Sequence, residues 1–284
     1  MTTPTTVPGT LYIVATPVGN LKDITFRAVE TLKQVPLIAA EDTRHTLKLL
    51  SHYEIKTQLI SCHEHNELRQ IPRIIQHLEQ GLDAALVSDA GTPCISDPGY
   101  QLVKQVSQKG FSVIPIPGCS AAIAGLSVSG LPTDAFLFLG FLPKKKNRRK
   151  EVLTDRRREQ ATLILYESPK RIVSLCEEII ETLGDRMACL AREITKRHEE
   201  YIRGPVSQIL ANLEQRPVVK GECALFVAGF NESKPSIEDM DMAQLIRSKL
   251  EEKPWKTSEL ARSLSDTYGI SKKQIYDMIV KIQS

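Results

Sequence analysis

Short apolar runs alternate with amphipathic, helix-like stretches along the first 130 residues. The runs are about as long as strands and rich in Leu, Ile, Val and Ala, which favours a mostly parallel sheet covered by helices on both faces. The predicted strands are Leu11–Thr16, Leu37–Glu41, Gln58–His63, Ala84–Asp89 and Ser112–Pro117. The predicted helices between them are Thr25–Lys33, Thr43–Tyr53, Glu67–Gln80 and Pro98–Lys109.

A second α/β pattern follows, and a helical tail ends the chain. The predicted strands of this second pattern are Phe136–Phe141, Thr162–Glu167, Met187–Arg192, Glu200–Arg203 and Cys223–Phe230, with a helix over Arg171–Leu183. After a linker at Asn231–Ser236, three helices are predicted over Met240–Glu251, Ser258–Thr267 and Ser271–Ile282. Ser271 and Gln274 fit a capping box. We therefore expect three domains: α/β over 10–130, α/β over 136–231, and a helix-turn-helix-like tail over 237–284.

The loops that follow the strands of the first sheet are rich in Gly, Pro, Ser and Asp. Ligands of parallel sheets bind beyond the carboxyl ends of the strands, so these loops are the candidate binding site. They are Thr16–Asn20, Glu41–Arg44, Ser88–Pro93, Ile95–Gly99 and Pro117–Ala121. Asp97 before Pro98 predicts a helix N-cap with proline at the first helical position. The glycine patterns of dinucleotide and nucleoside triphosphate cradles are missing from the sequence, and any one loop taken alone is as well explained as a plain turn.

Composition places the chain among folded globular proteins, with 42% apolar and 25% charged residues in 284. No apolar run approaches the roughly 20 residues of a membrane helix, and no secretory signal is visible, so we expect a cytosolic protein with no membrane partner. Six scattered cysteines without a Cys-x-x-Cys pair are typical of a reducing compartment. His63 and His65 could supply two metal ligands, but further ligands lack recognisable spacing, so we expect no metal.

One short segment carries the cationic character of the chain. Lys144–Arg158 holds nine basic residues against Glu151 and Asp155, a net charge of +7, whereas the whole chain has +3. Charge runs are usually solvated faces, but this one exceeds what solubility requires, and contact with RNA phosphates explains it better. The tail from 235 to 284 is neutral, so its charge gives no independent reason to regard it as a nucleic-acid binder.

Eight motifs in order resemble one known family. They are Val14–Leu21, Ala40–Arg44, His63–Asn66, Val87–Pro93, Ile95–Gly99, Pro117–Ala121, Tyr166–Arg171 and Ala191–Lys196. Over residues 10 to 230 and the helical tail, the chain resembles the ribosomal RNA small subunit methyltransferase I family. The resemblance implies a two-domain tetrapyrrole-methylase-like fold (class III methyltransferase) with a small C-terminal helical domain.

The resemblance also implies an activity and a donor site. It implies S-adenosylmethionine-dependent 2′-O-methylation of a cytidine in the decoding region of 16S ribosomal RNA, with the RNA expected within the small ribosomal subunit, by a homodimer. The sulfonium of the donor already makes the methyl group electrophilic, so no metal is needed. Carried over from related methylases, the residues expected to contact the donor are Pro17, Asp89, Thr92, Pro93, Ser120, Ala121, Tyr166 and Ala191.

Such a reaction needs alignment of the acceptor hydroxyl and a base for its proton. The candidate groups at strand ends are Glu41, Asp42, Glu167, Glu193 and Lys196. Each of them has a plausible structural role as a helix cap or ion-pair partner, and our hypothesis is that Asp42 or Glu193 is the base. The expected RNA contacts are Arg44, Lys144, Lys145, Arg148, Arg149, Arg156, Arg157 and Arg192.

Two alternative functions remain open at this point. The same fold and donor could serve a tetrapyrrole acceptor, although the basic segment and the tail have no obvious use there. The chain could instead be a helix-turn-helix regulator whose α/β body senses a small molecule, although recognition helices normally lie on a cationic surface and this tail is neutral.

Overall fold

The computed structural model describes residues 7–231, 242–252, 255–268 and 271–283. Its contacts divide the chain into two compact units, Met1–Phe230 and Asn231–Ser284. The expected linker, apart from Asn231, lies outside the described residues. Within the described residues, no helix combines the length and the apolar character needed to cross a bilayer.

The first sheet of the larger unit is fully parallel, as the apolar runs predict. Its strands are β1 (Leu11–Val14), β2 (Leu37–Ala40), β3 (Gln58–Ser61), β4 (Ala84–Val87) and β5 (Val113–Ile116). Their order is β3-β2-β4-β1-β5, so the carboxyl ends of all five strands lie at one edge. The buried runs of β2 and β4 hold the centre of this sheet.

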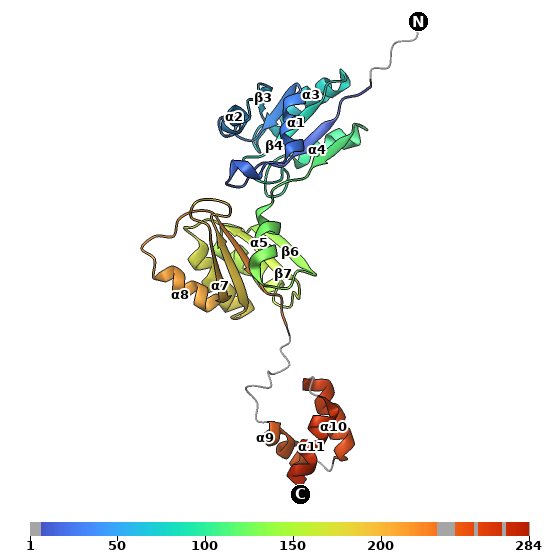
Figure 1. Ribbon diagram of the computed structural model, residues 1–284, viewed down its shortest axis with the longest axis vertical. Coiled ribbons are helices and arrows are strands. Elements are labelled where there is room, and N and C mark those ends of the chain that lie inside the picture. The colour runs from blue at the N-terminus through green and yellow to red at the C-terminus, as the bar shows by residue number, and fades with distance from the viewer. Residues whose placement is uncertain (1–6, 232–241, 253–254, 269–270, 284) are drawn as a thin grey trace. The chain divides into compact units, whose positions relative to one another are not determined.

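Helices cover both faces of the first sheet (Figure 1). The helices are α1 (Phe26–Gln34), α2 (Thr43–His52), α3 (Glu67–Glu79) and α4 (Tyr100–Gln108), with a short 3₁₀ turn, η1, at Leu21–Asp23. Leu32 of α1 and Leu50 of α2 pack with Ile38 on one face. Ile74 of α3 and Leu102 of α4 pack on the other. Each amphipathic stretch therefore buries its apolar side against the sheet.

The predicted cap at the start of α4 is wrong. The helix begins at Tyr100, and Gly99 is its N-cap with a φ of 122°. A Cβ atom at Gly99 would lie 2.5 Å from Leu86 Cδ2 and 2.9 Å from Cys94 Sγ, so glycine is required there. Asp97 is thereby left in the loop before the helix, where its carboxyl group is available for another role.

The second sheet is mixed. Its strands are β6 (Phe136–Phe141), β7 (Thr162–Glu167), β8 (Met187–Arg192), β9 (Glu200–Pro205) and β10 (Cys223–Val227), in the order β6-β7-β10-β8-β9. The pair β6–β7 is parallel, and the three remaining pairs are antiparallel. All five strands were expected from the sequence, and the bounds of β6, β7 and β8 coincide with the prediction.

Three helices around this sheet were not expected: α5 (Ala121–Ser129), α6 (Lys146–Asp155) and α8 (Val206–Glu214). Together with α7 (Ile172–Leu183), α6 and α8 cover one face of the sheet. Helix α5 covers the other face, where Ala122 and Leu126 pack against Phe226. A Cβ atom at Gly125 would lie 2.3 Å from the Phe226 ring, so this helix lies close to the sheet. Helix α5 thus follows β5 in the chain but packs on the second sheet.

The C-terminal unit consists of three helices around a small core. They are α9 (Met242–Glu252), α10 (Thr257–Tyr268) and α11 (Lys272–Gln283). Their core contains Ile246, Leu260, Leu264 and Ile279. The Gln274 backbone N–H donates to Ser271 Oγ at 3.2 Å, which is the first bond of the expected capping box.

Candidate active site

Loops from the first sheet and strand ends from the second enclose a cavity of about 400 Å³, which we call the first cavity. It is lined by Val18, Asp89, Ala90, Gly91, Thr92, Ile95, Ser96, Asp97, Ser120, Ala121, Phe141, Tyr166, Glu167, Ser168, Pro169, Ala191, Ile194, Glu222, Cys223 and Ala224. Six of the eight residues expected to contact the donor are in this lining. Pro17 lies in a neighbouring cavity, and Pro93 lines neither.

Hydrogen bonds between the loops fix the shape of the first cavity. Thr16 and Gly91 exchange both backbone hydrogen bonds, at 2.8 and 2.9 Å. Thr92 Oγ1 donates to the carbonyl oxygen of Cys119 at 3.1 Å, which ties the loop after β4 to the loop after β5. These hydrogen bonds fix the positions of the loops that form the cavity relative to one another.

The charged side chains that line the first cavity are all acidic. They are Asp89, Asp97, Glu167 and Glu222, and no Lys or Arg is present in this part of the described chain. The remaining lining includes the apolar side chains of Ile95, Phe141 and Ile194. A cavity of this size and character suits a small organic ligand that carries positive charge, and it disfavours a polyphosphate.

A second cavity of about 500 Å³ adjoins the first. Its lining is Thr16, Pro17, Val18, Gly19, Leu21, His45, Thr46, Lys48, Leu49, Ser88, Asp89, Ala90, Lys196 and Glu222. The two cavities share Val18, Asp89, Ala90 and Glu222. The second cavity differs in charge because Lys48 and Lys196 lie in its wall.

Lys196 is held between two carboxylates. Its Nζ lies 3.1 Å from Glu193 Oε1 and 3.0 Å from Glu222 Oε2. Burial acts to lower the pKa of Lys196, but the two carboxylates outweigh it and raise the pKa above its usual value. Lys196 is therefore a fixed cation in the second cavity, not the base that the sequence left possible.

The two residues favoured as the base from the sequence are both engaged elsewhere. Asp42 is the N-cap of α2, and its carboxylate binds the Arg44 guanidinium at 2.8 Å. The hydrogen bonds from Arg44 hold the pKa of Asp42 well below its usual range. Neither Asp42 nor Glu193 lines either cavity.

Glu193 is likewise engaged by its neighbours. Burial acts to raise its pKa, but the Glu222 backbone N–H, which donates at 3.0 Å, and Lys196 together lower it. A carboxylate with a lowered pKa accepts a proton less readily. Asp42 therefore caps a helix and Glu193 pairs with Lys196, which are the structural roles that the sequence allowed for these two residues.

A different carboxylate occupies the boundary between the cavities. Asp89, expected from the sequence as a donor contact, lines both of them. Its Oδ1 accepts the Asp42 backbone N–H at 3.1 Å, and its own N–H donates to Glu41 Oε2 at 3.3 Å. Burial raises the pKa of Glu41, although Glu41 lines neither cavity.

Glu167 and Asp97 complete the acidic groups of the first cavity. Glu167 Oε1 accepts the Ser168 backbone N–H at 2.6 Å and Arg171 Nε at 2.8 Å, so it is held in an ion pair. Burial, followed by repulsion from Glu41, raises the pKa of Asp97 to about 6. Asp97 was not predicted as a site residue because Pro98 after it indicated a helix cap. The loop Ile95–Gly99 that contains Asp97 was, however, among the predicted binding loops, and this position could have identified it.

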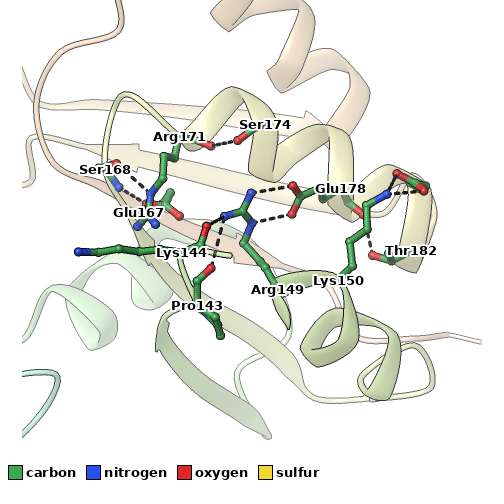
Figure 2. A network of polar contacts seen from close by, with 11 residues as sticks. Pro143, Lys144, Arg149, Lys150, Glu167, Ser168, Arg171, Ser174, Glu178 and Thr182 are labelled. Atoms are coloured by element: carbon green, nitrogen blue, oxygen red, sulfur yellow. Dashed lines mark hydrogen bonds and ion pairs between the residues drawn. The ribbon is translucent and has the colours of Figure 1, made fainter. Parts of the chain in front are cut away.

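The basic segment forms α6, and one of its arginines is buried (Figure 2). The side chains of Arg149 and Glu178 are 6% and 3% exposed. Arg149 Nε lies 2.6 Å from Glu178 Oε2, and Nη2 lies 2.7 Å from Oε1. Arg149 Nη1 also donates to the carbonyl oxygens of Pro143 and Lys144. The expectation that Arg149 contacts RNA is therefore corrected: its buried guanidinium binds Glu178 of α7 and the backbone just before α6.

Most of the other cations expected at the RNA are exposed. Lys144, Lys145, Arg148 and Arg157 are open to solvent, whereas Arg156 is half-buried. Two cations are paired, Arg192 with Glu200 at 2.9 Å and Arg44 with Asp42. Arg44 is nevertheless 89% exposed, so it remains accessible to a large anion.

The His63–Asn66 motif forms a turn after β3. His63 Nδ1 accepts the His65 backbone N–H at 3.2 Å, and Asn66 Oδ1 accepts the His63 N–H at 2.8 Å. Within the ranges that the structure describes, no three His, Cys, Asp or Glu side chains are grouped as a metal ion requires.

Comparison with known proteins identifies the family. The sequence model described as Tetrapyrrole (Corrin/Porphyrin) Methylases matches residues 10–210. The chain is 43% identical over 274 residues to a protein of Halalkalibacterium halodurans, with 95% of this chain and 94% of that protein covered. It is also 43% identical over 278 residues to a Synechocystis protein, with 97% and 99% covered. Both relatives are named ribosomal RNA small subunit methyltransferase I.

Solved structures share the fold at lower identity. Uroporphyrin-III-C-methyltransferase from Thermus thermophilus superposes with a TM-score of 0.54 at 19% identity, covering 78% of this chain and 94% of that one. A cobalt precorrin-4 methyltransferase of cobalamin biosynthesis superposes with a TM-score of 0.58 at 16% identity and the same coverage. The fold is that of the tetrapyrrole methylases, and the chain belongs to the ribosomal RNA small subunit methyltransferase I family within them.

Proposed function

We propose that this protein transfers a methyl group from S-adenosylmethionine to the ribose 2′-hydroxyl of a cytidine in the decoding region of 16S ribosomal RNA. The observation that carries the proposal is the pair of adjoining cavities that differ in charge, although both contain Asp89 and Glu222. The first has only acidic charged groups in its lining, and the second holds Lys48 and Lys196. A cationic donor and a phosphate-bearing acceptor would therefore meet at the wall that contains Asp89.

The residues of the first cavity fit the donor. Their acidic side chains complement a sulfonium and an α-ammonium group, and the apolar side chains of Ile95, Phe141 and Ile194 complement a nucleoside. Bound S-adenosylmethionine would supply an already electrophilic methyl group, so the protein's task is to orient the acceptor and remove one proton.

We assign the removal of the proton to Asp89. An Asp89 carboxylate oxygen would accept the proton of the acceptor hydroxyl, and Asp42 N–H on Oδ1 keeps the carboxylate oriented. The assignment replaces Asp42 and Glu193 as candidate bases because those two line neither cavity. Lys196, fixed by Glu193 and Glu222, would hold a phosphate of the acceptor strand.

The exposed cations of α6 and of the segment before it would extend the RNA contact beyond the cavities. Lys144, Lys145 and Arg148 lie at the start of this helix, where the backbone N–H groups also favour anions. The names of the relatives support a ribosomal RNA substrate, and a cytoplasmic location is part of the proposal. The tail helices would contribute to docking on the ribosomal particle.

The test is methyl transfer with isotopically labelled S-adenosylmethionine, followed by mass mapping of the modified nucleotide. Small ribosomal subunits lacking the modification, free 16S RNA and a tetrapyrrole acceptor are compared. The proposal expects label on one cytidine ribose with an RNA acceptor and no transfer to the tetrapyrrole. Label on a base, on another nucleotide or on the tetrapyrrole would refute it.

The family resemblance also leads us to propose a homodimer. Light scattering of the purified full chain should give about twice the mass of 31.7 kDa. A mass that stays at one chain over a hundredfold range of concentration would contradict this part of the proposal.

A further inference from the structure

Asp97 lies in the loop between β4 and α4, whose backbone is strained. Two residues of this loop that precede Asp97, Cys94 and Ser96, have positive φ angles of 70° and 66°, which are uncommon for residues other than glycine. Cys94 N–H donates to the Pro98 carbonyl oxygen at 3.3 Å and closes the loop. Strain of this kind persists where the surrounding structure fixes it, commonly at a ligand site. The loop places Asp97 in the lining of the first cavity.

No cation of the described chain balances Asp97. The acidic groups that act on it are Glu41 from the loop after β2 and Asp89 from the loop after β4. The neutral titratable groups beside it are Cys94 and Tyr166, whose pKa values it helps to raise. Among the described residues, Asp97 takes part in no salt bridge.

The other acidic groups of the first cavity all have partners. Glu167 binds Arg171 at 2.5 Å, and Glu222 binds Lys196 at 3.0 Å. Asp89 Oδ1 accepts the Asp42 backbone N–H. Asp97 hydrogen-bonds to the Ser88 side chain and, like Asp89, has no salt-bridge partner among the described residues, so a cation bound in the cavity would be its counter-charge.

We propose that Asp97 is a specificity residue that makes the first cavity bind a cationic methyl donor in preference to the neutral thioether left after transfer. This inference rests on the proposed function. When the methyl carbon leaves sulfur for oxygen, the electron pair of the broken C–S bond stays on sulfur, and the sulfonium charge disappears. Asp97 then loses its counter-charge, which favours exchange of the spent product for fresh donor.

The test is calorimetric binding to the full chain, with no reaction involved. Three probes are used: S-adenosylmethionine, an analogue with a protonated amine in place of the sulfonium, and S-adenosylhomocysteine. The variant is Asp97→Asn, and the matched control is Asp134→Asn, an exposed aspartate that does not line the cavity. In Asp97→Asn, both cationic probes should bind about tenfold more weakly. Binding of S-adenosylhomocysteine should stay within about twofold of the unaltered protein.

Two outcomes overturn the inference. They are an equal loss of affinity for all three probes, and no loss for any of them. If the unaltered protein binds none of the probes, the proposed function fails, so the two failures are distinguishable. The thermal midpoint of Asp97→Asn at pH 8 should equal or exceed that of the unaltered protein, because the variant removes an uncompensated charge.

The pH dependence of binding provides a second measurement. Because burial and Glu41 raise the pKa of Asp97 to about 6, its charge is lost as the pH falls from 8 to 5. Affinity for the amine analogue should fall over that range while affinity for the thioether stays level. Asp97→Asn should flatten the dependence for the analogue. A dependence that is unchanged in the variant would assign it to Glu41 and refute the role of Asp97.

Discussion

The two adjoining cavities share a wall but differ in charge. The first has four carboxylates and no Lys or Arg among its described lining residues, whereas the second has two lysines beside the shared Asp89 and Glu222. The first cavity is closed by β7, β8 and β10 of the second sheet, and the second by α2 and the loop after β1. The lysines of the second cavity come from α2, which carries Lys48, and from the segment after β8, which carries Lys196. In the proposed function, one sheet edge would serve a cationic donor and a phosphate-bearing acceptor.

The difference shows how little chemistry such a site requires of its protein. Catalysis by alignment needs each reactant held by complementary charge, with one proton acceptor between them. In the proposed mechanism, Asp89 in the shared wall would be that acceptor, and the hydrogen-bonded loops would supply the alignment. A substitution in one cavity, or in the wall between them, shows whether the other cavity responds.

The largest effect is expected at the shared wall. Asp89→Asn should lower the single-turnover rate of methyl transfer by roughly 10²–10⁴-fold, because the amide no longer accepts the proton. Donor affinity should fall by no more than about tenfold, because Asp89 also lines the donor cavity, and RNA affinity should change by less than about threefold, so the rate is compared at saturating donor. The matched control is Asp42→Asn, which alters the neighbouring carboxylate outside both cavities. If Asp42→Asn loses as much rate as Asp89→Asn, the assignment of the base is wrong.

A second large effect is expected in stability and not in chemistry. Glu178→Ala leaves the buried Arg149 guanidinium without its partner, which should cost about 3–5 kcal/mol in the free energy of unfolding. Urea denaturation followed by circular dichroism measures this loss. Glu181→Ala, which breaks the exposed contact to Lys150, should cost less than about 1 kcal/mol. Equal losses in the two variants would show that burial of the Arg149–Glu178 pair is unimportant.

The buried arginine also illustrates what the sequence could and could not predict. Apolar runs such as Ala84–Val87 gave the strands because a strand buried on both faces must be continuously apolar. Helix α5 was missed because its small apolar residues surround the whole helix, with no amphipathic face. Helix α6 was missed because cations dominate it. The four-residue spacing of Arg149 and Leu153, both buried on one face, was its faint signal.

The sequence likewise predicted one part of the candidate site and not another. The sequence and the family resemblance located the loops, and six of eight expected donor residues line the first cavity. They did not settle which carboxylates face a ligand, since that depends on tertiary contacts. Asp42 pairs with Arg44, and Glu193 pairs with Lys196. Asp97 lines the first cavity, because Gly99 and not Asp97 is the N-cap of α4.

The exposed face of the basic segment should contribute to RNA binding without affecting the cavities. Lys144→Gln, Lys145→Gln and Arg148→Gln combined should weaken binding of the RNA by roughly 50-fold at physiological salt if each cation contacts one phosphate. The slope of log affinity against log salt should become shallower by about two. Fluorescence anisotropy over a salt series measures both quantities. Unchanged affinity and slope would remove α6 from the RNA surface.

The smallest effect is expected in the second cavity itself. Lys48→Gln removes one exposed cation from its wall, and the loss of one phosphate contact should weaken RNA binding about fourfold. Donor affinity should not change, because Lys48 does not line the first cavity. The control is Lys33→Gln on α1, an exposed lysine that lines neither cavity. If Lys48→Gln weakens donor and RNA binding alike, the two cavities do not hold separate ligands, and the contrast in charge between them has no functional meaning.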